Sequence, residues 1–313
     1  MKNLLVDKWI PVLTSSGSID MVSICDVCNQ SNVRIVGNHM EAFGIYRLLI
    51  AVRSDGVDLD SVKDRFDASS FMQTSDNDGA HKPISYLTPD IPTGTNSIHF
   101  RHNCMDENKF FCWGCIARAL CSLPAFCTVG GAGLSPSVNG GPPLYWLPLG
   151  KNIEETMKLN CKIASQGEFV PWRRDRRVYH QFEIVSFGHG LTFLPRRIHV
   201  FWLRKTAQCT RCGQTADLGA REMIFAPGDR RIGDSWRDPH VLYGKKEIPI
   251  RAFGHRTDGY RINDKAIDWA QFVANAWHRD DITIRPIGEQ FQVFGAVTDK
   301  AKFEDVFSLD FAP

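Results

Sequence analysis

Two cysteine pairs of the form CxxC constrain this chain more than any other local feature of its sequence. They are Cys112–Cys115 and Cys209–Cys212, separated by the 93 residues from 116 to 208. Two residues between cysteines let both thiolates face one tetrahedral ion at about 2.3 Å, and Gly213 suits the tight turn of such a knuckle. Four thiolates leave no open position on the ion. The pattern predicts a closed, structural zinc site that joins two distant parts of the chain.

A third pair, Cys25–Cys28, competes for this role. It has no following glycine and lies beside Ile24 and Val27, which is typical of a half-buried helix or turn in which cysteine is a packing residue. The same interpretation applies to the remaining cysteines, which are Cys104, Cys121, Cys127 and Cys161. The N-terminal apolar run, residues 4–6, is too short for a signal peptide. Ten cysteines in a chain without a signal peptide favour a reducing compartment. We expect a cytoplasmic protein.

The composition is that of a globular protein that does not enter a membrane. Of the 313 residues, 43% are apolar and 23% are charged, and no apolar stretch is long enough to span a bilayer. The formal net charge is only +2, so any affinity for nucleic acid has to come from local basic patches.

The hydrophobic pattern predicts one irregular α+β domain, residues 1–313, with long loops and a structural four-cysteine zinc site. Apolar residues at helical spacing indicate helices over 40–52, with one face in the core, and over 116–120 and 265–278. Strand-like runs occupy residues 3–13, where Pro11 ends the strand, 182–187 and 197–203. Strands and helices do not alternate regularly, which argues against a doubly wound sheet.

Residues 127–141 contain five glycines and predict close contact between backbone and a ligand or another chain. The stretch does not fit a phosphate-binding loop, because Gly133 is followed by Leu134 and Ser135 and the stretch contains no lysine to reach the phosphates. It does not fit the dinucleotide-binding fingerprint either. An irregular loop rich in turn residues remains the alternative.

A basic cluster follows, in which the arginines are Arg173, Arg174, Arg176 and Arg177. Arginine pairs with phosphate through two hydrogen bonds, so the cluster predicts contacts with a DNA backbone, with a solvated loop as the alternative. His180, His189 and His199 have no acidic residue at metal-ligand spacing, and the common hydrolase and deaminase patterns are absent. We therefore expect a protein that is not an enzyme. The alternative is a zinc-stabilised enzyme acting on a phosphorylated substrate held at the glycine loop.

Taken in order, several motifs resemble the CasA family, the large subunit of the type I-E CRISPR Cascade complex. They are NLLVDKWIPV at 3–12, FMQT at 71–74, the first CxxC running into an alanine-rich helix, GGPP at 140–143, and CTRCG at 209–213. The resemblance implies a ribonucleoprotein subunit of antiviral defence that works with guide RNA (crRNA), other Cascade subunits and target double-stranded DNA. It implies recognition of a protospacer-adjacent motif (PAM) from the minor groove and help in starting the R-loop. A nuclease, either HNH-fused or separate, would belong to another subunit or partner.

The family's functional positions carry over residue by residue. The zinc ligands are the four cysteines already named. The positions expected to read the motif are Gly130, Gly131, Ala132, Gly133, Lys245, Lys246 and Ala301. The expected wedge that opens the duplex is Asp299 and Lys300, with lysine where the family has glutamine. The loop expected at the guide-RNA end is Phe100, Arg101 and His102.

Family members continue into a C-terminal helical bundle, whereas this chain ends at Pro313. The stretch GAVTDKAKFEDVFSLDF keeps the wedge region intact. We expect a short form that works in a complex whose nuclease is not recruited through that bundle.

Overall fold

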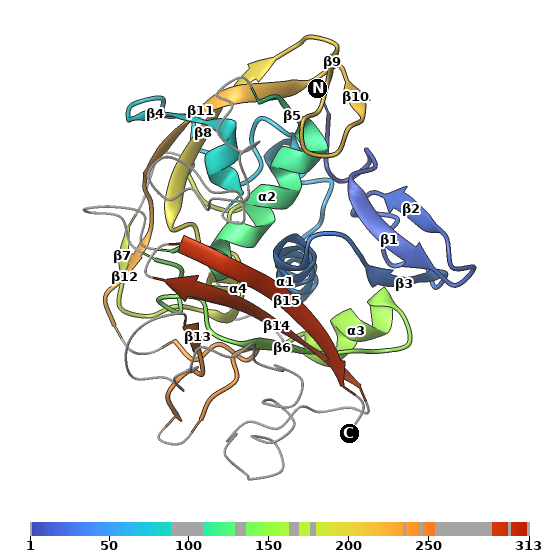
Figure 1. Cartoon of the computed structure of the whole chain (residues 1–313), viewed down its shortest axis with the longest axis vertical. Coiled ribbons are helices and arrows are strands. Elements are labelled where there is room, and N and C mark those ends of the chain that lie inside the picture. The colour runs from blue at the N-terminus through green and yellow to red at the C-terminus, as the bar shows by residue number, and fades with distance from the viewer. Residues whose placement is uncertain are drawn as a thin grey trace.

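The helix α1, His39–Asp55, lies in the middle of the molecule, with strands on several sides of it (Figure 1). Asn38 caps the helix by accepting hydrogen bonds from two backbone N–H groups of the first turn. Every residue from Met40 to Ala51 is buried. The expectation of a single core-facing side was therefore too narrow, because the other helices and several strands cover α1 all round.

The computed structural model describes residues 2–88, 109–128, 136–162, 169–175, 180–233, 236–244, 247–253, 290–299 and 302–311. The other α-helices are α2 (Trp113–Phe126), α3 (Ile153–Asn160) and α4 (Phe187–Leu191), and the 3-10 helices are Lys63–Phe66 and Ile84–Leu87. The strands are β1 (Ile10–Thr14), β2 (Ile19–Val22), β3 (Asn32–Ile35), β4 (His81–Pro83), β5 (Phe111–Cys112), β6 (Tyr145–Pro148), β7 (Gln181–Phe182), β8 (Arg196–Leu203), β9 (Ala207–Gln208), β10 (Thr215–Ala216), β11 (Gly219–Pro227), β12 (Arg230–Arg231), β13 (Ala252–Phe253), β14 (Phe291–Asp299) and β15 (Lys302–Phe311). None of the helices within these ranges is long and apolar enough to cross a membrane.

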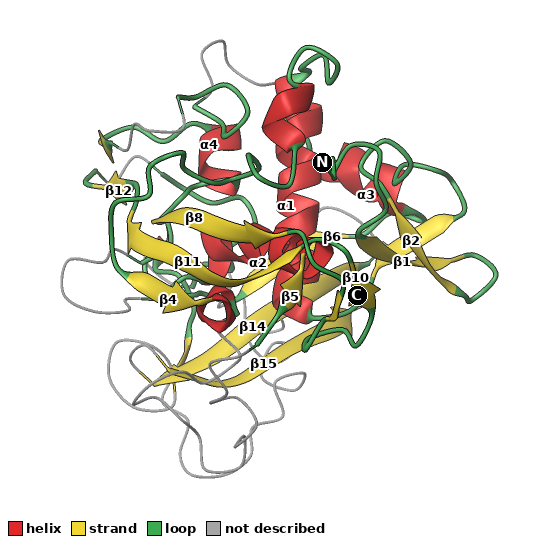
Figure 2. Cartoon of the chain, turned by 90° about the horizontal axis from the view of Figure 1, so that it is seen from above, coloured by secondary structure: helices red, strands yellow, loops and turns green. Residues whose placement is uncertain are grey.

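The strands form several small sheets around α1, which gives the mixed α+β class that the sequence predicts. β1 pairs with β2 and β3, while β11 pairs with β4, β5 and β8. β14 pairs with β6, β13 and β15, and two short pairs join β9 to β10 and β7 to β12. Figure 2 shows the β1 sheet on one side of α1, the β8–β11–β4 sheet on another, and the long β14–β15 hairpin along a third.

α1 and α2 cross at Gly44. A Cβ atom at this position would overlap the carbonyl oxygen of Cys121 in α2, so only glycine permits such a close approach. Beside it, the ring of Phe43 packs against Phe126 of α2 and Phe294 of β14, with centroids 5.9 and 4.8 Å apart. The main core is therefore built where these two helices meet the β14 sheet.

A buried ion pair joins α1 to a loop far along the chain. Nη1 of Arg47 donates to both carboxylate oxygens of Asp238 at 3.0 and 2.8 Å, and both side chains are fully buried. The other guanidinium nitrogens donate to two carbonyl groups of α4. Asn139 Nδ2 donates to the same carboxylate at 2.7 Å. The charges are thus paired and hydrogen-bonded, as burial requires.

The ion pair also determines how nearby groups titrate. Burial alone would raise the pKa of Asp238, but Arg47 and His240 outweigh it and hold the pKa below its ordinary value. Burial lowers the pKa of His240 to about 3, with Asp238 acting in the opposite direction and Arg47 and Lys162 adding to the decrease. His240 is therefore neutral in the folded protein down to strongly acidic pH.

Three expected elements are confirmed and two are wrong. The helices over 40–52 and 116–120 lie within α1 and α2, and the strand over 197–203 lies within β8. The strand expected at 3–13 begins only at Ile10 and contains Pro11, because Leu4 and Leu5 are buried in a turn.

The run 182–187 is not a strand. It contributes one residue to the short strand β7 and one to the start of α4. Of its two β-branched residues, Val185 is buried and Ile184, in the bend, is exposed. The helix expected at 265–278 lies outside the described residues.

Candidate metal centre and nucleic-acid interface

The four predicted zinc ligands converge at one point. The sulfur atoms of Cys112, Cys115, Cys209 and Cys212 all lie within 4.8 Å of one another. Two of the separations are 3.8 Å, from Cys112 to Cys212, and 3.7 Å, from Cys115 to Cys209. Sulfurs at about 2.3 Å from a tetrahedral zinc ion are about 3.8 Å from one another. The residues therefore fit the ion that the sequence predicts, as a closed four-thiolate site.

Local structure holds each pair in place. Cys112 ends β5 and occupies the position just before α2, whose first turn carries Cys115. The second pair lies on the turn between β9 and β10, where Gly213 has a φ of 75° and its N–H donates to the Cys209 carbonyl. Thr210 N donates to the Phe110 carbonyl at 2.8 Å, which fastens one knuckle to the other. The left-handed glycine confirms the tight turn inferred from the sequence.

The hydrogen bonds among the sulfurs favour deprotonated sulfur at Cys209, while together with burial they raise the pKa of the Cys112 and Cys115 thiols. Hydrogen bonds from the Cys112 and Cys115 thiols hold the pKa of Cys209 well below its ordinary value, and Cys112 N donates to the same sulfur at 3.3 Å. Thiolate is the form that binds metal. Three of the ligands are buried, and Cys212 is exposed.

The competing pair is not part of this cluster. Cys25 is exposed on a turn, and the Cys28 sulfur lies 3.6 Å from the sulfur of Met157. Burial raises the pKa of both Cys121 and Cys127, as expected of packing cysteines. Among the described residues, the four-cysteine cluster is the one group of histidine, cysteine and acidic side chains placed to hold a metal ion.

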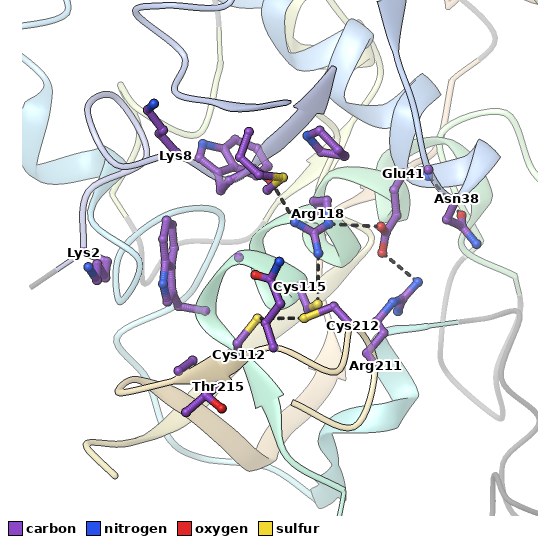
Figure 3. Close-up of a pocket in the computed structure, with 18 of the residues that line it drawn as sticks. Lys2, Lys8, Asn38, Glu41, Cys112, Cys115, Arg118, Arg211, Cys212 and Thr215 are labelled. Carbon is purple, nitrogen blue, oxygen red and sulfur yellow. Dashed lines mark hydrogen bonds and ion pairs between the residues drawn. The ribbon is translucent and has the colours of Figure 1, made fainter. Parts of the chain in front are cut away.

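Two arginines and a glutamate that the sequence analysis missed surround this cluster (Figure 3). Arg118 Nη2 lies 3.0 Å from the Cys115 sulfur, and its Nε lies 3.4 Å from a carboxylate oxygen of Glu41. The other oxygen of Glu41 lies 2.7 Å from Arg211 Nη2. All three line a cleft of about 680 Å³ beside the cysteines. Arg118 lies three residues after a ligand on a helix, a spacing that could have revealed it, whereas Glu41 carries no local signal.

The glycine-rich stretch is only partly described. Gly130, Gly131, Ala132 and Gly133 lie outside the described residues, as do the guide-end residues Phe100, Arg101 and His102. The ends of the stretch are fixed. Ser137 N donates to the Cys127 carbonyl at 2.8 Å, and Arg196 Nη2 donates to the Thr128 carbonyl at 2.7 Å. Residues 127 and 137 are thus held close together.

Arg251 fixes the far end of the same stretch. Its Nη2 donates to the Asn139 carbonyl at 2.8 Å, and its Nε donates to the Gly141 carbonyl at 3.0 Å. Asn139 is itself buried and also receives a hydrogen bond from Trp236 Nε1 at 2.9 Å. The chain therefore leaves the glycine-rich stretch along a defined path.

The expected lysines lie at a turn whose base is described. Lys245 and Lys246 are outside the described residues, but Tyr243 and Pro249 on either side form an antiparallel bridge. Gly244 N donates to the Ile248 carbonyl at 2.9 Å. The backbone thus reverses direction between residues 244 and 248.

The expected wedge lies at the turn of the β14–β15 hairpin. Asp299 and Lys302 are the last paired residues of the two strands, and Lys300 and Ala301 between them lie outside the described residues. β13 pairs with the end of β14, with Ala252 opposite Val297. The hairpin turn is therefore close in the fold to residues 249–253.

The arginines of the basic cluster do not share one environment. Arg174 is buried and paired with both carboxylate oxygens of Asp229, so its expected contact with a DNA backbone is incompatible with its place in the protein interior. Arg173 is about half exposed and pairs with Asp55. Arg176 and Arg177 are outside the described residues. The spacing of four arginines gave no sign that one of them has a buried partner.

The three histidines lie in different environments, from the buried His189 to the exposed His180. His189 is buried among the rings of Phe169, Phe182 and Phe193. Nδ1 of His199 lies 3.2 Å from the Thr74 carbonyl oxygen. His180 packs edge-on against Phe182.

Comparison with known proteins adds a family to this geometry. No curated protein matches the chain. Among solved structures, CasA (Cse1) of Thermus thermophilus is 20% identical, with a TM-score of 0.70 over 100% of this chain and 75% of that one. Cse1 of Thermobifida fusca is 15% identical, with a TM-score of 0.65 over 99% of this chain and 73% of that one.

A chain from a structure described as a CRISPR RNA-guided surveillance complex is 12% identical, with a TM-score of 0.67, covering 99% of this chain and 76% of that one. At these identities the likeness shows a shared fold. The sequence itself matches the model of the CRISPR-associated protein Cse1 family over residues 3–55 and 58–308, nearly its whole length. The chain therefore belongs to the CRISPR-associated Cse1 family, also called CasA.

Proposed function

We propose that this chain is the large subunit of a type I-E, RNA-guided Cascade surveillance complex. In this role it recognises the protospacer-adjacent motif of target double-stranded DNA from the minor groove and helps to start the unwinding that forms an R-loop. It works with guide RNA and the other subunits, and another subunit or partner supplies the nuclease. Family membership and the likeness to a chain of a surveillance complex support the assignment to Cascade.

One observation supports DNA reading by this chain in particular. The three segments expected to meet DNA, residues 130–133, 245–246 and 299–301, are far apart in the sequence, yet their flanking residues all connect to residues 249–253. Pro249 closes the turn at 245–246, Arg251 holds the end of the glycine-rich stretch, and β13 pairs beside the hairpin turn. A reading surface needs such a shared base, because its elements must enter one groove together.

The chemistry of each segment suits the minor groove. Glycine lets the backbone approach closely in a narrow groove where larger side chains would clash. A lysine ammonium suits its acceptor atoms and negative potential. The exposed Arg173, with Arg176 and Arg177, remains a candidate for phosphate contacts, and we leave the buried Arg174 out of this set.

The test is binding of target duplexes by a complex reconstituted from this chain, guide RNA and the partner subunits. We expect Gly131→Asp to weaken target binding at least about tenfold while the complex still assembles, because it places bulk and negative charge in a negative groove. Replacing Lys245 and Lys246 by alanine should reduce discrimination between motif sequences. Lys151→Ala, an exposed lysine before α3, is the matched control. Normal target binding by the glycine variant would contradict the proposal.

Arg251→Met tests the shared base separately. Arg251 holds two carbonyl groups of the glycine-rich stretch and has no proposed contact with DNA. If the base positions the reading segments, this variant should lose motif discrimination in the assembled complex, as the lysine variants do. Full discrimination in a variant with the two hydrogen bonds removed would contradict a common reading surface.

A further inference from the structure

We propose that Arg118 and Arg211, both held by Glu41, are positioning residues of the metal centre. They offset the negative charge of the metal–thiolate group and fix its two knuckles against each other. The residues lie together beside Cys112, Cys115 and Cys212 in the cleft of Figure 3. This role is independent of whether the chain reads DNA.

Arg118 has a partner for each part of its guanidinium group. Nη2 contacts the Cys115 sulfur at 3.0 Å, Nη1 donates to the Trp9 carbonyl at 2.8 Å, and Nε faces Glu41 at 3.4 Å. The guanidinium group is planar and its N–H groups point in fixed directions, so three partners on different sides allow it only one orientation. Nη2 is thereby aimed at a metal ligand.

Glu41 connects the two halves of the cluster. Its second oxygen lies 2.7 Å from Arg211, which stands between Cys209 and Cys212 in the second knuckle. The carboxylate itself comes from the first turn of α1 and is buried. A chain of contacts therefore runs from the first knuckle through α1 to the second.

Charge explains why guanidinium groups are needed at this place. Four thiolates and one divalent ion carry a net charge of about −2, and three of the four cysteines are buried. Buried charge is costly unless it is paired and hydrogen-bonded. The Cys209 sulfur has a backbone donor in Cys112 N, and Cys212 is exposed to water. Arg118 serves as the side-chain donor to the deeply buried Cys115.

Two explanations of this arrangement make opposite predictions for Glu41. If only the summed charge mattered, Glu41→Gln would remove a negative charge near the thiolates and the metal would be held more tightly. If Glu41 acts by orienting two guanidinium groups, the same substitution releases both, and the metal is held less tightly. We expect the second result.

The experiment measures the release of zinc from the full-length chain into an excess of a coloured chelator. Loss of a group that orients metal ligands commonly weakens binding about 10- to 100-fold. We expect Arg118→Met to release zinc at least about tenfold faster than the unmodified chain, and Arg118→Lys to fall between them, since lysine keeps the charge without the planar fork. Arg34→Met, which removes an arginine paired with Asp310 at the surface, is the matched control.

Each result decides the proposal. Release at the unmodified rate from Arg118→Met would overturn the role of Arg118, and unchanged or slower release from Glu41→Gln would overturn positioning by Glu41. The visible absorption of the cobalt-substituted protein provides a second readout, because it reports ligand geometry and does not respond to a general loss of stability. If Arg118→Met does not fold, Arg118→Lys and Glu41→Gln still discriminate, since the first keeps the charge and the second keeps the size of the side chain.

Discussion

The four-cysteine cluster and the Arg47–Asp238 pair both connect parts of the chain that are far apart in sequence, but they do so by different means. The cluster brings two short knuckles together and places their four sulfurs where they could hold an ion from solution. The ion pair is completed by the chain's own atoms, since Asn139 and two carbonyl groups of α4 satisfy the remaining hydrogen-bonding groups. The first connection therefore depends on a metal ion in the surrounding solution, whereas the second depends only on atoms of the folded chain.

This difference determines what each connection contributes to stability. A metal site that is absent from the unfolded chain adds its binding free energy to folding. A buried ion pair loses on desolvation most of what it gains by attraction, but removing one partner leaves an unpaired charge in the interior. We therefore expect the cluster to stabilise the fold, and the ion pair to specify which segments pack together.

The largest effect is expected at the cluster. Cys112→Ser or Cys209→Ser should abolish tight zinc binding and greatly reduce the yield of soluble protein, because zinc contributes on the order of 10 kcal/mol to folding in small finger peptides. Metal analysis and thermal unfolding of the purified chain provide the measurement. Cys25→Ser, at an exposed cysteine outside the cluster, is the control and should behave like the unmodified protein. Well-folded protein without bound metal would show that the cluster is not a structural zinc site.

A smaller loss of stability is expected when one partner of the ion pair is removed. Arg47→Met should lower the free energy of unfolding by about 3–5 kcal/mol, because the Asp238 carboxylate is left buried without its cation. The double variant Arg47→Met with Asp238→Leu should be more stable than the single one. Urea unfolding of the zinc-saturated proteins measures both. A double variant less stable than Arg47→Met would contradict the expected cost of leaving the Asp238 carboxylate buried without its cation.

The smallest effect is a dependence on pH. The pKa of His240 is about 3 in the folded protein and about 6.5 in an unfolded chain, so below pH 6.5 the unfolded state binds the extra proton. Stability from this group is present above pH 6.5 and falls as the pH decreases toward 3. The lowered pKa of Asp238 also stabilises the fold, and this contribution is lost as the pH falls, at more acidic pH than that of His240.

Between pH 7 and pH 5 we expect His240 to account for a loss of about 2 kcal/mol in the free energy of unfolding. His240→Gln should show a loss smaller by that amount when both proteins are unfolded with urea in buffers containing zinc. An equal loss in the two proteins would contradict a buried, neutral His240.

The metal centre was predictable because its information is local. Each CxxC pair places two ligands at a spacing that suits one ion, so the pattern needs no knowledge of the fold. The helix over 40–52 was found for a similar reason, since its apolar residues repeat with the helical period. Pro11 misled the prediction of the first strand. Proline has no N–H group, so a strand tolerates it only where the pairing does not need that donor, and the sequence does not show which positions these are.

The buried ion pairs had no such signal. Arg47 and Asp238 are 191 residues apart, and Arg174 and Asp229 are 55 residues apart. Nothing in the sequence near either arginine distinguishes a buried side chain from a solvated one. The basic cluster that contains Arg174 was therefore interpreted as an exposed surface that contacts DNA. Only the three-dimensional arrangement of the strands decides which arginine meets a carboxylate inside the protein.

One consequence follows from the course of α2. The helix begins at the metal centre, ends at Phe126, just before the glycine-rich stretch, and is about 21 Å long. Its contact with Gly44 leaves no space for even a methyl group, so the backbone of α2 packs directly on α1 at this point. We expect a displacement at one end of this helix to shift the other end. By thermodynamic reciprocity, a ligand that displaces α2 at its Phe126 end would change the affinity for metal by the same factor by which metal changes the affinity for that ligand.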